Sequence, residues 1–196
     1  MVVLDAALRF LEARHRSVEE VRRRLTSAGY REELITAAVE RLADLGMLND
    51  ESFATQWVES RDRARPRGER ALRAELAQRG VDRATVDAVL AERRDLTESG
   101  RDGVGRETEA DDIRSPDSMA AERLLERRGR ALARGADPRA RRQRAYALLV
   151  RNGFDSSTAT DVAARWAKAL GAGTGNAVSA DSADSADQDD QGPSVG

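Results

Sequence analysis

The residues of this sequence with the greatest capacity for chemistry are its arginines, because the usual catalytic groups are scarce. The 196 residues include no cysteine and one histidine, and they contain no GxxxxGK phosphate-binding loop. His15 stands between two arginines, where we expect an exposed residue at a helix end and not a base or a metal ligand. We therefore predict no catalytic residue, no metal site and no cofactor, and a protein that is not an enzyme.

Arginine supplies 32 of the 33 basic residues, since Lys168 is the only lysine. A guanidinium pairs in a planar fork with a carboxylate or a phosphate, so a cluster of arginines is a candidate contact surface for an acidic protein or for DNA. A solvated face is the alternative, because a general preference for arginine over lysine can place such residues anywhere. We select three clusters as candidate contacts: Arg14 and Arg16; Arg61, Arg63, Arg65 and Arg67; and Arg139, Arg141, Arg142 and Arg144.

The third cluster stands in the most basic part of the chain. Residues 119–170 hold 12 basic and five acidic residues, a net charge of +7 in a chain whose total is -2. Several of the arginines follow Asp137 and Pro138, which predict a helix start. Positive charges at that end oppose the helix dipole, which costs stability and favours a role in binding a partner.

The pattern of apolar residues predicts an all-α fold. Apolar residues recur at intervals of three and four along most of the chain, and strand-like alternation does not extend beyond a few positions. Residues 93–118 and 171–196 lack the pattern and are rich in glycine, serine and acidic residues, so we predict a disordered insert and a disordered acidic tail. The tail has five aspartates and no basic residue, and we hypothesise that it screens nearby arginines from phosphate; deleting it should then tighten binding at low salt.

Three helix ends share one pattern, a leucine four residues before a glycine and an apolar residue directly after it. A glycine at this point adopts the left-handed conformation at little cost, and the next residue folds back against the last helical turn. The apolar positions eight residues before each glycine, and six and ten residues after it, also match. The residues that define the pattern are Leu25, Gly29 and Tyr30; Leu76, Gly80 and Val81; and Leu149, Gly153 and Phe154.

The matching positions predict three tandem units of three helices in an elongated, curved arrangement. Ser17, Asp50 and Asp137 are the expected N-caps of three of these helices. Phe53 and Trp57, four residues apart on one helix face, are expected to pack in the core rather than to stack on bases. The units are placed at residues 1–46, 47–92 and 119–170.

The sequence resembles the bacterial RecX regulators of the RecA recombinase. The resemblance is close from about residue 4 to residue 92, and it is fainter from 119 to 170. Its most specific part is the string GMLND at residues 46–50, followed by Phe53 and Ala54. This string comes one unit after Arg16 and the expected N-cap Ser17. The residues that carry the resemblance are Arg14, Arg16, Ser17, Glu20, Val21, Gly46 to Asp50, Phe53, Ala54, Arg61, Gly68, Leu72, Glu75, Leu76, Gly80 and Val81, with Arg151, Gly153 and Phe154 in the third unit.

The resemblance implies a fold, a partner and an activity. Members of the family are built from three tandem three-helix repeats, which form a long, curved molecule that lies in the groove of the RecA filament on DNA. They limit the ATP hydrolysis and strand exchange of the filament, and so restrain recombination, DNA repair and the SOS response. The resemblance therefore implies that this chain is a RecA regulator whose arginines contact the filament, with DNA contact confined to phosphates.

A second reading of the residues remains open, a helical DNA-binding protein that acts as a transcription or nucleoid factor. Because no base-reading motif is present, such DNA contact would be sequence-tolerant. Asp5, Arg9 and Glu12 interrupt the apolar run of the first residues, which favours a first helix over a signal peptide or a membrane span. Together with the lack of cysteine, this favours a cytoplasmic protein with no membrane contact, which we expect to be a monomer.

Overall fold

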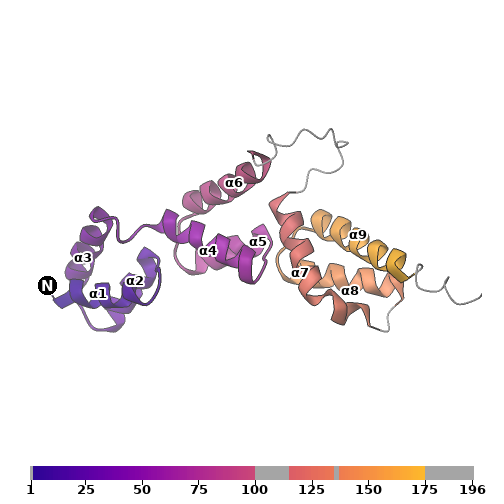
Figure 1. Ribbon diagram of the computed structural model, residues 1–196. Helices are drawn as coiled ribbons and strands as arrows, with labels where there is room; N and C mark the ends of the chain where they lie inside the picture. Colours follow the sequence, from indigo (N-terminus) through magenta and orange to yellow (C-terminus); the bar gives the residue numbers. More distant parts are fainter. Residues whose placement is uncertain (1, 100–114, 135–136, 175–196) are drawn as a thin grey trace, which may run out of the picture.

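The structure, a computed structural model, describes residues 2–99, 115–134 and 137–174. Within these ranges it contains nine α-helices and no β-strand, which confirms the predicted all-α fold (Figure 1). None of the described helices is both long and apolar enough to cross a membrane. The helices are α1 (Val2–Glu12), α2 (Val18–Ser27), α3 (Glu32–Asp44), α4 (Asp50–Ala64), α5 (Glu69–Gln78), α6 (Arg83–Ser99), α7 (Pro116–Ala133), α8 (Pro138–Arg151) and α9 (Ser156–Thr174).

The helices form three groups that follow one another along an elongated molecule (Figure 1). We call them unit 1 (α1 to α3), unit 2 (α4 to α6) and unit 3 (α7 to α9). Each unit encloses its own cluster of buried apolar side chains, which confirms the prediction of tandem three-helix units. The positions matched from the three glycines are all buried: Val21, Leu25, Ile35 and Val39; Leu72, Leu76, Val86 and Leu90; and Ala145, Leu149, Ala159 and Ala163.

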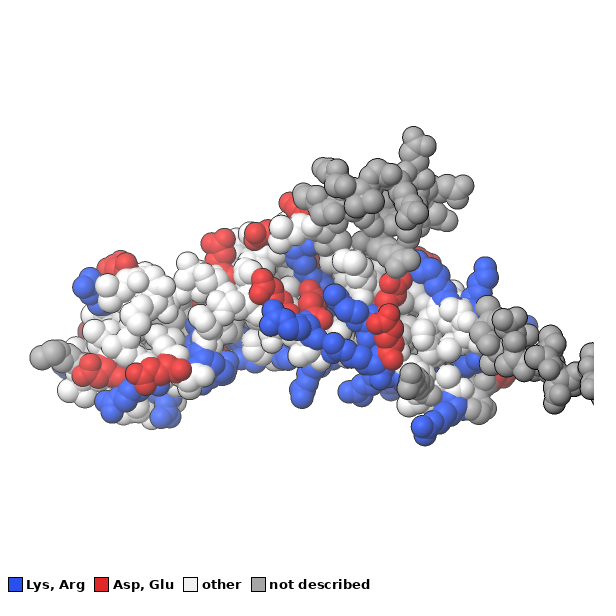
Figure 2. All heavy atoms as spheres, viewed as in Figure 1, with Lys and Arg blue, Asp and Glu red and all other residues white. Residues whose placement is uncertain are grey.

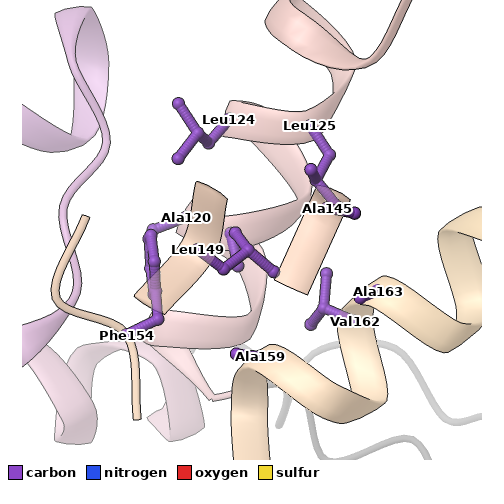
Figure 3. Packing of buried hydrophobic residues seen from close by; sticks show 10 residues of the cluster. Ala120, Leu124, Leu125, Ala145, Leu149, Phe154, Ala159, Val162 and Ala163 are labelled. Carbon is purple, nitrogen blue, oxygen red and sulfur yellow. The ribbon is translucent and has the colours of Figure 1, made fainter. Parts of the chain in front are cut away.

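Unit 3 fills its core with smaller residues than the other two units do. Figure 3 shows Leu149 of α8 near the centre of this core, with Phe154 on one side and Val162 of α9 on the other. Small side chains let the helices approach closely. Gly129 of α7 also permits close approach, because a Cβ at this position would lie only 2.6 Å from the ring of Trp166. The buried alanines of this core are Ala120, Ala121, Ala145, Ala159 and Ala163.

All three predicted helix ends close in the same way. Gly29, Gly80 and Gly153 have φ angles of 83°, 81° and 85°. Each glycine N–H donates to the carbonyl three residues earlier, and the next N–H donates to the carbonyl of the leucine, at 3.2 to 3.3 Å. This confirms the predicted Schellman closure. The same pattern also occurs at the end of α3, between Leu42 and Met47, where the sequence reasoning overlooked it.

Two of the three predicted N-caps are confirmed. Ser17 caps α2 and Asp137 caps α8, each by accepting the backbone N–H three residues further on. The prediction that Asp50 caps α4 is wrong, because Asn49 does so. Asp50 is instead the first residue of α4, and its carboxylate accepts the N–H of Val18 in unit 1 at 2.9 Å.

The insert predicted at residues 93–118 is too wide at both ends. Helix α6 continues to Ser99, and helix α7 starts at Pro116 after the N-cap Ser115. The prediction failed at Arg93 because a charged residue there interrupts the apolar period, although the side chain is only 9% exposed. Buried ion pairs take the place of apolar packing at this position.

The remainder of the predicted insert, residues 100–114, lies outside the described residues. The same holds for residues 175–196 of the predicted acidic tail. The prediction that the tail begins at residue 171 is wrong, because α9 continues to Thr174.

The middle helices of units 1 and 2 meet end to end, in a contact that we call the first joint. The N-terminus of α2 lies against the C-terminal end of α5. The hydroxyl of Ser17 donates to the carbonyl oxygen of Arg79 at 2.5 Å, and Asp50 of α4 accepts the N–H of Val18 at 2.9 Å. Ser17 is fully buried there.

The second joint repeats this contact between units 2 and 3, where the N-terminus of α5 lies against the C-terminal end of α8. The N–H of Gly68 donates to the carbonyl oxygen of Asn152 at 3.1 Å. Asp117 of α7 accepts the N–H of Glu69, the first residue of α5, at 2.9 Å. Since a helix N-terminus meets a helix C-terminus in both joints, the dipoles of α2, α5 and α8 attract one another along a row.

Candidate docking surface

The first arginine cluster lies beside the first joint. Arg14 is exposed, and its guanidinium is 3.4 Å from the carboxylate of Glu20. The guanidinium carbon of Arg16 lies 4.1 Å from the centre of the Phe10 ring. Burial lowers the pKa of Arg16, and the positive charges of Arg14 and Arg79 lower it further, against the opposing charge of Glu20. A bound anion would relieve this repulsion.

The structure divides the second cluster into two pairs. Arg61 and Arg67 are half-buried, and their Nε atoms lie 2.6 and 3.3 Å from the two carboxylate oxygens of Glu75. They therefore hold α4 and the connection after it against α5. Arg63 and Arg65 are exposed at the end of α4, and these two are the members of the cluster most open to a partner.

The third cluster occupies the first turns of α8, as predicted from Asp137 and Pro138. Arg139, Arg142 and Arg144 are exposed, whereas Arg141 is half-buried. The first turn of α8 contains no acidic residue. Arg139 and Arg142 line a groove of about 510 Å³ between α8 and α9, together with Gln143, Tyr146, Thr160 and Ala163. This groove offers two guanidinium groups and no carboxylate to an anionic partner.

Three further arginines join the units, and the sequence reasoning did not select any of them. Arg79 lies at the first joint, with its guanidinium 2.5 Å from Glu20 and 3.7 Å from the centre of the Trp57 ring. Arg127 of α7 donates to the carbonyl oxygens of Arg63 and Ala64 at 2.7 Å, so it satisfies the C-terminal end of α4. Arg93 lies at the second joint. No local signal distinguishes these arginines, because each acts on a unit distant in sequence.

Arg93 connects three helices through carboxylates. It donates to both oxygens of Asp62 in α4 at 2.9 Å and to Asp117 in α7 at 2.7 Å. Burial by itself would lower the pKa of Arg93, but the hydrogen bonds and charges of the two aspartates raise it. Burial raises the pKa of Asp117 against the opposing effects of Glu69 N–H and Arg93. The guanidinium therefore stays charged in a nearly closed environment and fixes unit 3 on unit 2.

The described surface is rich in guanidinium groups. Figure 2 shows Lys and Arg side chains gathered over the middle of the molecule, around α5 and its junction with α7. Among the described residues, no three His, Asp or Glu side chains are placed to hold a metal ion. Phe53 is 3% exposed and stacks on Trp57 with ring centroids 6.1 Å apart. The predicted core packing is confirmed for Phe53, whereas Trp57 is half-buried and packs against the core. Arg61 and Arg79 both lie over the Trp57 ring.

Two family models match the first two units. Residues 4–42 match the model described as RecX, first three-helix domain, and residues 49–90 match RecX, second three-helix domain. A protein named Regulatory protein RecX from Mycolicibacterium vanbaalenii is 34% identical over 161 residues, which cover 79% of this chain and 77% of the relative. A protein of the same name from Mycobacterium avium is 40% identical over 131 residues, covering 62% of this chain and 73% of the relative.

Solved structures share the fold. A crystal structure of RecX from Lactobacillus salivarius has a TM-score of 0.59 and 20% identity, over 82% of this chain and 91% of that structure. A second crystal structure, titled as the regulatory protein RecX, has a TM-score of 0.61 and 18% identity, over 80% of this chain and 67% of that structure. At these identities the likeness concerns the arrangement of helices alone.

Proposed function

Because the chain belongs to the RecX family of regulatory proteins, we propose that it regulates the RecA recombinase by docking along the RecA filament on DNA. Docking would limit ATP hydrolysis and strand exchange by the filament, and so restrain recombination, repair and the SOS response. The proposed protein performs no bond chemistry itself. It acts in the cytoplasm as a monomer, through its shape and its clusters of arginines.

The observation that supports this proposal most directly is the row of α2, α5 and α8. Two equivalent joints hold three similar units at successive positions along an elongated molecule. A filament presents the same protein surface at regular intervals, so a row of units can make several weak contacts with it at once. Contacts that are tethered in this way combine into a high affinity without any one of them being strong.

The exposed arginines are the proposed contacts. Arg63 and Arg65 in unit 2 and Arg139 and Arg142 in unit 3 have open guanidinium groups. They suit acidic patches on the recombinase, with phosphates of the bound DNA as a second target. Arg61 is assigned a structural role in this proposal because Glu75 already holds its Nε.

The test is a titration of RecA ATPase activity on single-stranded DNA. Wild-type protein should suppress ATP hydrolysis at concentrations too low to coat the DNA. A triple variant with Arg139→Glu, Arg142→Glu and Arg144→Glu, three exposed arginines of the third cluster, should need a much higher concentration for the same suppression. The matched control carries Arg31→Glu, Arg41→Glu and Arg83→Glu, since these arginines are also exposed but lie outside the selected clusters and outside α5.

The outcomes separate the proposed regulator from a plain DNA-binding protein. A plain DNA binder would suppress ATP hydrolysis only near full coverage of the DNA, and RecA would play no part in its binding. If wild-type protein behaved in that way, the proposal would be overturned. If the triple variant and its control inhibited equally well, the regulator would stand and the assignment of the third arginine cluster would fail.

A further inference from the structure

A groove of about 580 Å³ runs between unit 1 and unit 2 on the side of α1 and α4. It lies between the C-terminal end of α1 with the segment that follows it and the N-terminal half of α4. The connection from α3 to α4 forms a third wall. The residues that line it include Leu8, Leu11, Arg14, Arg16, Met47 and Phe53.

Part of the groove is apolar and open to solvent, beside the polar side chains of Asn49, Ser52 and Gln56. Met47 is 51% exposed, although its backbone is fixed by the closure of α3. Leu8 and Leu11 are only half-buried, and Phe53 lies at the base with 3% exposure. Covering these side chains would remove apolar surface from water, and a methionine side chain adapts readily to the shape of what covers it.

One rim of the groove is basic. Arg14, His15 and Arg16 stand together on it, and Glu12 is the acidic residue among the lining side chains. Arg14 shares the carboxylate of Glu20 with Arg79, so one carboxylate serves two guanidinium groups. The Nε of Arg16 is buried without a hydrogen-bond partner. An occupant with carboxylates beside an apolar side chain would satisfy the rim and the wall together.

The aromatic residues near the groove favour a protein segment over a nucleic acid. Single-stranded DNA is held by bases that stack on open aromatic faces. Phe53 is buried, and the guanidinium of Arg16 lies over the ring of Phe10 at 4.1 Å. A base would therefore find arginines and the small imidazole of His15 on this rim, but no open phenyl or indole ring to stack on. A leucine or phenylalanine side chain, in contrast, finds Leu8, Leu11 and Met47.

We propose that this groove binds a short acidic segment of a protein partner, which inserts one large apolar side chain between Leu11 and Met47 and places its carboxylates against Arg14 and Arg16. This inference deepens the proposed function, and rests on it only in taking the recombinase as the protein that carries the segment. The groove itself is independent of the exposed arginines of unit 3.

The experiment measures peptide binding to the full chain by fluorescence anisotropy, without RecA. The probe is a fluorescein-labelled peptide, Glu-Asp-Leu-Phe-Asp-Glu. Control probes replace its acidic residues by lysine, replace Leu-Phe by Ala-Ala, or consist of labelled oligo-dT. The chain offers a matched pair of variants, Met47→Glu and Leu45→Glu, because both side chains are 51% exposed on one connection but only Met47 lines the groove.

Wild-type protein should bind the acidic probe, and Met47→Glu should weaken binding at least about tenfold through lost apolar contact and added like charge. Leu45→Glu should leave the affinity unchanged, and the lysine and alanine probes should not bind. Equal effects of the two variants, or binding of oligo-dT that Met47→Glu abolishes while the peptide does not bind, would overturn the proposal. An ATPase titration with wild-type protein tests the proposed function separately, since it does not depend on the probe.

Discussion

The two joints use one backbone arrangement with different side chains. In the first joint the hydroxyl of Ser17 bridges to the carbonyl of Arg79, whereas in the second the N–H of Gly68 reaches the carbonyl of Asn152 directly. The backbones are therefore closer at the second joint. A Cβ on Gly68 would lie only 2.3 Å from the carbonyl oxygen of Gly153, and glycine is required there by space and not by its φ angle.

The ionic contacts differ in the same direction. At the first joint the Arg79 and Glu20 side chains remain 25% and 16% exposed. At the second joint Arg93 is 9% exposed and lies between Asp62 and Asp117. Because screening by water weakens the exposed pair, we expect the first joint to open more readily than the second. We therefore expect unit 1 to be attached to unit 2 more loosely than unit 3 is.

The largest expected effect comes from removing the buried cation of the second joint. Arg93→Met leaves Asp62 and Asp117 without their guanidinium, and an unpaired carboxylate in a closed site is costly. We expect a loss of about 3 kcal/mol in the free energy of unfolding. Arg79→Met, the matched change at the first joint, should cost about 1 kcal/mol because its pair is more exposed. Urea denaturation followed by circular dichroism measures both, and equal losses would contradict the difference between the joints.

Exchanging the two N-cap residues tests the spacing of the joints. Gly68→Ser adds a Cβ where the Gly153 carbonyl leaves no space, so we expect a loss of about 2 kcal/mol. Ser17→Gly removes the hydroxyl that spans the first joint and should cost about 1 kcal/mol, since glycine remains an acceptable N-cap. Hydrogen exchange should show reduced protection of α5 and α8 in the Gly68→Ser variant and of α2 in the Ser17→Gly variant. A harmless Gly68→Ser substitution would show that the second joint is not close-packed.

A third comparison uses the two aspartates that accept helix N–H groups. One oxygen of Asp117 accepts from Glu69 N–H and the other from Arg93, whereas Asp50 accepts through one oxygen, from Val18 N–H, among the residues that the structure describes. In the Asp117→Asn variant the amide nitrogen, itself a donor, must face either the Glu69 N–H or the Arg93 guanidinium. We therefore expect the free energy of unfolding, measured by urea denaturation, to fall by about 2 kcal/mol. Comparable stability of this variant and the wild type would indicate that water enters the second joint.

The helix ends could be predicted from the sequence, but the joints could not. A Schellman closure involves six consecutive residues, so Leu25, Gly29 and Tyr30 contain all the information it needs. The joints bring together groups far apart in the sequence, 62 residues in the case of the Ser17 hydroxyl and the Arg79 carbonyl. No local pattern reports such a contact. From the sequence, the polar residues of the two joints could therefore be interpreted only as helix caps or as charges on the surface.

The position of Arg93 illustrates the limit of the apolar pattern. Counted from the glycine that ends the middle helix of each unit, Arg93 is equivalent to Leu42 in unit 1 and to Trp166 in unit 3. Both of these residues pack in or against a core. An arginine at that position interrupts the pattern, so the sequence alone suggested that the helix had ended. For the same reason the arginine clusters could be selected from sequence only by density, and Arg61 and Arg67 proved to contact Glu75 inside unit 2.

The smallest expected effect is Asp50→Asn at the first joint, and its value lies in its pH dependence. Burial raises the pKa of Asp50; the Val18 N–H lowers it, while the charges of Asp82 and Glu19 raise it. The folded protein therefore holds this proton more tightly than the unfolded chain, and Asp50 lowers the stability as the pH rises from the ordinary value of 3.8 through its raised pKa.

The Asp50→Asn variant keeps an oxygen for the Val18 N–H but cannot ionise. Its unfolding free energy should match the wild type at low pH and exceed it by about 0.5 kcal/mol or less above the titration. Denaturation curves at several pH values measure the difference. A variant less stable than wild type at neutral pH would mean that the charge of Asp50 is paired across the first joint. Both joints would then depend on an ion pair, and the difference between them would disappear.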